Sequence, residues 1–158
     1  MSLTAITRAE VETIVRPSEL PGLFADESQI LSIIESICDK VVMAVNSGGY
    51  WATLKTGRSK VPPELVHTAL VLVRHACIAK APGSSISNKL EGSPRSAEYR
   101  TAVETLQAVA EGALALNDYT IGADPEDLVP AEEQDGSVSW GCEPVMDTNI
   151  LFMRQHEH

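Results

Sequence analysis

The sequence predicts a mainly α-helical protein: a small bundle of three longer helices plus a short N-terminal helix, followed by an extended C-terminal arm. Three observations support this prediction. Apolar residues recur at three- and four-residue spacing in three long stretches. A helix-start signal precedes each helical stretch, the short first one included. Aromatic residues make up only 4% of the chain, so the core is expected to be aliphatic.

The first helix is predicted from a capping box, Thr7-Arg-Ala-Glu10. In this motif the N-cap hydroxyl and the Glu three residues later satisfy free backbone N–H groups reciprocally. We expect a helix over roughly residues 7–16 that stops before Pro17, because a residue that precedes proline disfavours the helical conformation. The following stretch, RPSELPGL, contains two prolines and a glycine and is expected to be a turn-rich connection.

The second helix is expected to be long and buried. Asp26 is a suitable N-cap, and a stripe of apolar residues follows at helical spacing. The stripe consists of Ile30, Ile33, Ile34, Ile37, Val41 and Val45, and it is widened by Leu31, Cys38 and Val42. The helix is expected to end in Asn46-Ser47-Gly48-Gly49, where glycine can adopt the left-handed conformation common after helix ends.

Residues 50–60 are expected to form a loop, with a possible short strand at Trp51–Leu54. The phrase Val61-Pro62-Pro63-Glu64 then opens the third helix, because proline is tolerated in a first turn. Apolar residues cover most sides of this helix, which is typical of a central helix. It is expected to end at Ala81-Pro82-Gly83.

The last helix is expected to start at Ser93-Pro94 and to run to about Leu116. Its predicted core face consists of Ala102, Val103, Leu106, Val109, Ala110 and Leu114. The helical domain is therefore expected to span residues 1–117.

Residues 118–158 differ sharply in charge from the domain before them. Residues 1–117 contain 11 basic and 12 acidic residues, a net charge of −1, whereas residues 118–158 contain one basic and ten acidic residues, a net charge of −9. The acids between Asp124 and Asp135 do not have the spacing of a calcium-binding loop, and we interpret them as a solvated acidic segment. Three prolines in this stretch favour an extended arm.

An apolar cluster follows this acidic stretch: Trp140, Met146, Ile150, Leu151 and Phe152. Two interpretations stay open. The cluster is core if the arm folds back on its own helices. It is a set of partner-binding anchors if the arm reaches outward, and tryptophan is enriched among such anchors. We expect that deletion of residues 138–158 leaves a folded helical domain.

The sequence contains no catalytic or metal-binding signature. Phosphate-binding glycine motifs, HExxH and GxSxG are absent, so we expect no enzyme and no cofactor. Cys38 and Cys77 are interpreted as small buried apolar residues, and no cysteine or histidine spacing fits a metal site. His67 and His75 are interpreted as ordinary helix histidines.

Lys55, Arg58 and Lys60 form a small basic loop. It is either a solvated loop or an electrostatic contact, made with the acidic arm of a neighbouring copy or with passing DNA. The overall net charge of −10 argues against a protein that binds duplex DNA through clustered cations. No apolar run reaches the length of roughly 18–20 residues that spans a bilayer, and no secretory signal is visible, so we expect no membrane partner and cytoplasmic synthesis.

The order of elements resembles a known family. The phrase Val61-Pro62-Pro63-Glu64-Leu65 runs into Ala69-Leu70-Val71-Leu72-Val73-Arg74-His75, and the final helix reads SAEYRTAVETL over residues 96–106, followed by Ala110-Glu111-Gly112. This pattern resembles the head–tail connector proteins of tailed bacteriophages, also called adaptor or head-completion proteins. The resemblance covers roughly residues 4–117.

The resemblance implies a structural virion protein at the head–tail junction, made in the cytoplasm of a bacterial host. Family members form an oligomeric ring, typically of twelve subunits, beneath the portal protein. They extend the channel for the genomic DNA, which passes without sequence-specific binding, and they carry stopper or tail proteins. Their C-terminal arms commonly dock on the portal. Alternative hypotheses are a phage tail-completion protein and a small acidic helical protein that binds or regulates a partner.

Overall fold

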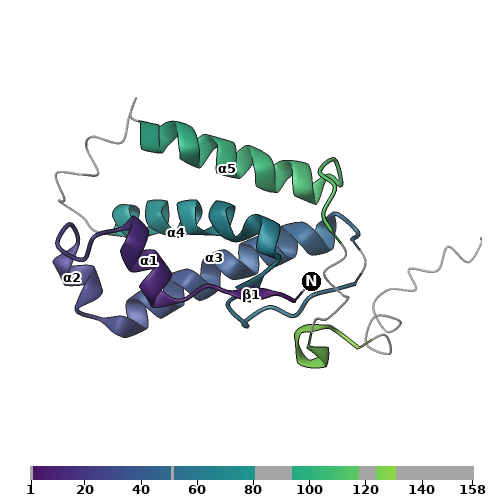
Figure 1. Cartoon of the computed structure of the whole chain (residues 1–158), viewed down its shortest axis with the longest axis horizontal. Coiled ribbons are helices and arrows are strands. Elements are labelled where there is room, and N and C mark those ends of the chain that lie inside the picture. The colour runs from purple at the N-terminus through teal and green to yellow at the C-terminus, as the bar shows by residue number, and fades with distance from the viewer. Residues whose placement is uncertain (1, 51, 81–93, 118–123, 131–158) are drawn as a thin grey trace, which may run out of the picture. The chain divides into compact units, whose positions relative to one another are not determined.

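The computed structural model describes residues 2–50, 52–80, 94–117 and 124–130, and these residues are mostly helical, as predicted (Figure 1). The chain divides into two compact units, Met1–Leu128 and Val129–His158. Of the predicted extended arm, residues 118–158, the structure describes only residues 124–130. The apolar cluster, Trp140, Met146, Ile150, Leu151 and Phe152, lies outside the described residues.

The short N-terminal helix forms as the capping box predicts. Helix α1 spans Arg8–Ile14; the Thr7 N–H donates to Glu10 Oε2 (2.8 Å), and the Glu10 N–H donates to Thr7 Oγ1 (3.4 Å). The turn-rich connection contains a further one-turn helix, α2, at Pro21–Phe24, which the sequence analysis missed. Its residues Leu23 and Phe24 are buried in the core.

The long helix α3 spans Glu27–Ser47, and the N–H of Ser28 donates to Asp26 Oδ1 (3.0 Å) at its start. All six residues of the predicted stripe are buried, and so are Cys38 and Val42. The expectation for Leu31 was wrong, since 49% of this residue is exposed. The helix ends as expected, because Gly49 takes the left-handed conformation with φ +69°.

A two-residue strand pair lies beside the helices and was not predicted. Strand β1 (Thr4–Ala5) pairs antiparallel with β2 (Lys60–Val61), and Thr4 faces Val61. The prolines after β2 start a 3-10 turn, η1 (Pro63–Leu65), which continues into α4 (Val66–Lys80). Helix α4 contacts α1, α3 and α5, so it is the central helix that the sequence indicated.

The last helix, α5, spans Pro94–Ala110 and is shorter than predicted. It stops because Gly112 takes a φ of +69°, and the Gly112 N–H donates to the Val109 carbonyl (3.0 Å). The predicted core face was also partly wrong. Ala102 and Val109 are buried, but Val103 is 41% exposed and Leu114 is 38% exposed. Figure 1 shows α5 lying along one side of α3 and α4.

The first compact unit extends past the expected boundary at residue 117. A 3-10 turn, η3, spans Pro125–Asp127, and Leu128 forms an isolated β-bridge with Leu54. Residues that follow α5 by more than ten positions therefore belong to the helical body. In place of the possible strand at Trp51–Leu54, the described part of the loop shows this bridge at Leu54; Trp51 itself lies outside the described residues.

Candidate functional site

The basic loop, Lys55–Lys60, binds an acidic segment of its own chain. We call Asp124–Leu128 the latch segment. Lys60 Nζ lies 2.6 Å from Asp127 Oδ2 and 3.5 Å from Asp124 Oδ2. The Arg58 guanidinium lies 3.8 Å from Glu126 Oε2 and donates to the Glu126 carbonyl (3.3 Å). Two of the three predicted loop cations are therefore paired with acids from the start of the predicted arm.

These ion pairs differ in burial. The Asp127 side chain is only 3% exposed and that of Lys60 is 30% exposed, whereas Asp124 and Glu126 are 75% and 80% exposed. An exposed pair contributes little because water and salt screen it, but a buried carboxylate that loses its cation is strongly destabilising. The Lys60–Asp127 pair is thus the central contact. Its hydrogen bond raises the pKa of Lys60, and Asp124 adds to the shift.

Backbone contacts hold the latch segment against the same loop. The Lys55 N–H donates to the Asp127 carbonyl (2.9 Å), next to the bridge between Leu54 and Leu128. Leu54 is fixed in turn by Asn46 of α3, whose side-chain amide donates to the Leu54 carbonyl (3.0 Å) and accepts from its N–H (2.9 Å). The long helix therefore positions the loop, and the loop positions the latch segment.

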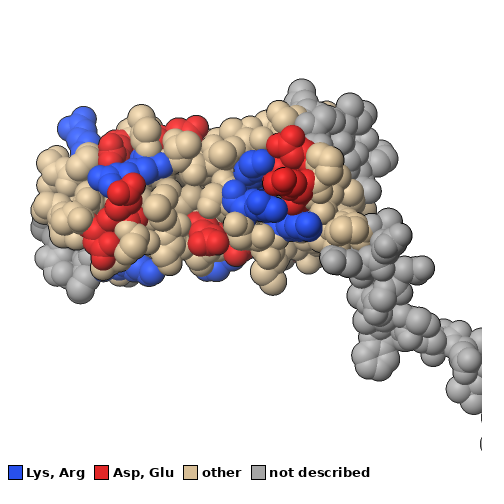
Figure 2. Space-filling model, turned by 90° about the horizontal axis from the view of Figure 1, so that it is seen from below, with Lys and Arg blue, Asp and Glu red and all other residues tan. Residues whose placement is uncertain are grey.

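Charge on this part of the surface is mixed in sign. On the face shown in Figure 2, basic and acidic side chains lie next to one another in mixed groups. The loop also meets α3, where the Gly57 N–H donates to Asp39 Oδ1 (2.6 Å). Contact of the loop with a neighbouring copy or with passing DNA stays a prediction.

The role of Asp127 was not predicted from the sequence. The acids from Asp124 to Asp135 were interpreted as solvated, and this was wrong for Asp127, which is buried. Two sequence signals were available: Pro125 can begin a helical turn, and Leu128 places an apolar residue directly after the acids. Neither signal indicates that Asp127 pairs with Lys60, which lies 67 positions earlier in the chain.

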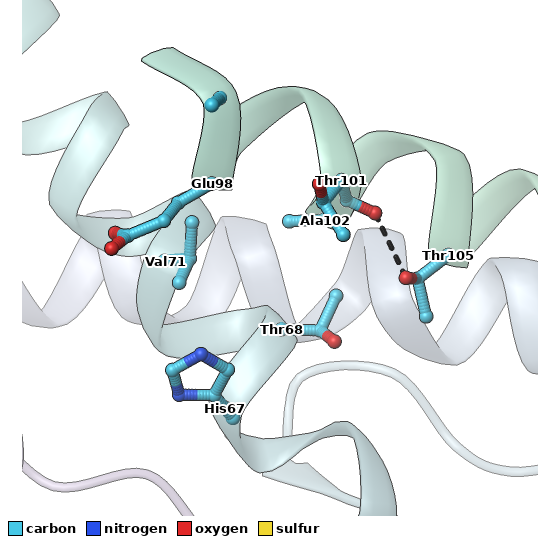
Figure 3. A pocket seen from close by; sticks show the side chains of 8 residues that line it. His67, Thr68, Val71, Glu98, Thr101, Ala102 and Thr105 are labelled. Atoms are coloured by element: carbon cyan, nitrogen blue, oxygen red, sulfur yellow. Dashed lines mark hydrogen bonds between the residues drawn. The ribbon is translucent and has the colours of Figure 1, made fainter. Parts of the chain in front are cut away.

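A cavity of about 330 Å³ lies between α4 and α5 (Figure 3). Its lining includes His67 and Thr68 from α4 and Glu98, Thr101 and Thr105 from α5. Two of these polar groups already have partners. The Thr105 hydroxyl donates to the Thr101 carbonyl (2.8 Å), and Glu98 pairs with Arg74, whose hydrogen bond lowers the pKa of Glu98. We assign no ligand to this cavity.

A groove of about 250 Å³ is formed by α3, α4 and α5. It is lined by Ile37, Lys40, Leu72, His75, Ala76, Tyr99, Val103 and Leu106. The imidazole of His75 stacks on the Tyr99 ring with a centroid separation of 3.7 Å and an interplanar angle of 15°. Burial lowers the pKa of His75, and the neighbouring Arg74 lowers it further. The groove is thus an apolar surface that favours a neutral histidine.

The lowered pKa predicts a loss of stability in mild acid. A neutral histidine in the folded protein contributes stability above its ordinary pKa of 6.5, and this contribution is lost as the pH falls through the lower folded value. We expect the melting temperature to fall between pH 7.5 and pH 5, and to fall less in His75→Phe, which keeps a stacking ring but cannot be protonated. Thermal melts of both proteins test this, and equal pH slopes would contradict it.

Cys38 and Cys77 are buried free thiols, as predicted. Burial raises their pKa to about 12 and about 11 respectively. Among the described residues, no group of three His, Cys, Asp or Glu side chains could hold a metal ion. Within the same residues, no helix has the length and apolar character needed to cross a membrane.

No protein-family model, curated protein or solved structure matches this chain. The fold and the site together are a helical body of α3, α4 and α5 whose basic loop binds the downstream segment Asp124–Leu128.

Proposed function

We propose that this chain is a head–tail connector of a tailed bacteriophage, a structural protein that forms a ring, of about twelve copies by the family resemblance, between the portal and the tail proteins. The observation that carries the proposal is the order of elements: a capped short helix, a long apolar helix, a proline-started central helix and a last helix stopped by Gly112. This is the order on which the family resemblance rests.

A closed ring requires two different complementary surfaces on each subunit. Helix α3 offers candidates for both. Leu31 is half exposed, and Lys40, nine residues later, borders the groove formed by α3, α4 and α5. At 3.6 residues per turn, nine residues place Lys40 about half a turn from Leu31. We propose that these two sides of α3 take part in subunit contacts, and that the residues after Leu128 form the arm that docks on the portal.

The first test is assembly of the purified chain, measured by light scattering over a concentration series, alone and with isolated portal rings. We expect a mass that rises towards a ring, or binding to the portal when the portal acts as template. A chain that stays monomeric and does not bind portal would contradict the proposal and favour a small acidic binding or regulatory protein.

The second test deletes residues 138–158, which removes all five apolar arm residues. Loss of a single hot-spot residue costs about 2 kcal/mol or more in a typical interface, so even one such anchor among the five predicts that portal binding weakens by about 30-fold or more. The helical body should keep its circular dichroism spectrum and its melting temperature. Unchanged portal binding would refute the arm's role, and an unfolded protein would show that the deleted residues belong to the core.

A further inference from the structure

The latch segment is attached to the helical body by few contacts. Within the described part of the chain, the hydrogen bonds from the loop to this segment come from three donors: the Lys55 N–H, the Arg58 guanidinium and the Lys60 ammonium. Leu128 is the one apolar residue of the segment that packs against the hydrophobic core, whereas the helices share one continuous core of many buried residues. Segments with few buried apolar contacts open locally at a lower free energy than the core does. The latch segment therefore has the features of a separately opening unit.

One contact dominates this attachment. The Asp127 carboxylate is buried and its cation, Lys60, is partly exposed. In the open state both charges regain water, so opening leaves neither charge buried without a partner. In a variant that lacks one partner, the closed state must bury the other uncompensated, which favours opening. The equilibrium between the open and the closed state of the segment thus depends mainly on this ion pair.

We propose that residues 124–128 open and close as a unit while α3, α4 and α5 stay folded, and that the closed state fixes the point where the chain after Leu128 leaves the helical body. In the closed state this point lies at the Leu54 bridge. In the open state, the five residues 124–128 are added to the tether of the arm. Fully extended, they add about 17–18 Å.

The consequence for binding rests on the proposed function. A short, fixed attachment holds the arm at a high effective concentration near a partner site, whereas a longer tether dilutes it. The closed latch therefore pre-organises the arm for the portal, and opening it lowers the affinity of docking.

Hydrogen exchange of the full-length chain, measured by mass spectrometry, tests the latch without any partner. In Asp127→Asn we expect peptides that contain the Lys55 and Asp127 amides to exchange about tenfold faster, because the neutral amide no longer balances Lys60. Peptides from α3 and α4 should keep the wild-type rate. Glu126→Gln is the matched control, since its ion pair is 80% exposed on the acidic side, and it should leave all rates within about twofold.

A second variant removes the cation of the same ion pair. Lys60→Met keeps the apolar stem but leaves Asp127 unpaired, and it should reproduce the local increase in exchange. Faster exchange throughout α3 and α4 in both variants would show that the segment is part of the cooperative core and would overturn the proposal. Unchanged exchange at Lys55 would overturn it as well.

Portal binding separates the two proposals. If wild-type chain does not bind portal, the proposed function fails, while the exchange data still decide whether the latch exists. If wild-type chain binds and Asp127→Asn binds equally well despite a faster Lys55 amide, the role of the latch in docking is refuted.

Discussion

Replacing Ile34 by alanine should lower the free energy of unfolding by about 3 kcal/mol, within the range of about 2–5 kcal/mol for such core truncations. Ile34 is 1% exposed and lies on the core face of α3. The alanine loses the transfer free energy of three carbons and leaves a cavity that α3 cannot close by moving, because it contacts both α4 and α5. For a protein of this size the melting temperature should drop by roughly 10 °C.

Leu31→Ala is the matched control on the same helix. It removes the same number of carbons from a side chain that is 49% exposed. We expect a change of less than about 0.5 kcal/mol, as for most surface substitutions. Urea unfolding followed by circular dichroism measures both values. Similar losses for the two variants would mean that Leu31 is covered, for example by another copy of the chain.

The second large effect is expected at Gly48. A Cβ atom there would collide with the Val109 carbonyl and with the Tyr50 ring, and a backbone carbonyl in a helix cannot rotate away. Gly48→Ala should therefore push the ends of α3 and α5 apart and cost about 2–3 kcal/mol, as overpacking usually does. Gly112 lies at the same junction between the ends of α3 and α5, since a Cβ added to it would lie 3.3 Å from the Gly48 carbonyl.

Gly22→Ala is the control for this substitution. It lies in α2, and an added Cβ there would meet no atom within 4 Å. Because alanine favours a helix over glycine, the variant should be neutral or more stable by up to about 1 kcal/mol. Thermal melts of the two variants should thus move in opposite directions. A neutral Gly48→Ala would show that the junction between α3 and α5 can widen without loss of stability.

The helices could be predicted because their signals are local. The capping box Thr7–Glu10 and the Asp26 cap act within one turn, and the α3 stripe repeats within one helix. The end of α5 was missed although Gly112 was visible, because the later Leu114 and Leu116 continue the apolar spacing. Leu116 is in fact buried, but it lies beyond the helix.

The latch segment and the strand pair could not be predicted because their partners are distant in sequence. Strand β1 pairs with residues 60–61, and Asp127 pairs with Lys60. Periodicity says nothing about such contacts, and a surplus of acids is usually solvated. The basic loop was identified from the sequence, and a neighbouring copy or DNA was the predicted alternative to solvent. The chain's own residues 124–128 were not predicted as the partner of the loop.

The buried cysteines give the helical body an internal reporter of opening. With thiol pKa values of about 12 and about 11, Cys38 and Cys77 are in the reactive thiolate form in at most about one molecule in ten thousand at pH 7. A thiol reagent therefore modifies them when α3 or α4 separates from the core, and the rate of modification measures how often this happens. In a Cys142→Ser background, Cys38 and Cys77 are the remaining thiols, so the measured rate refers to the opening of α3 and α4.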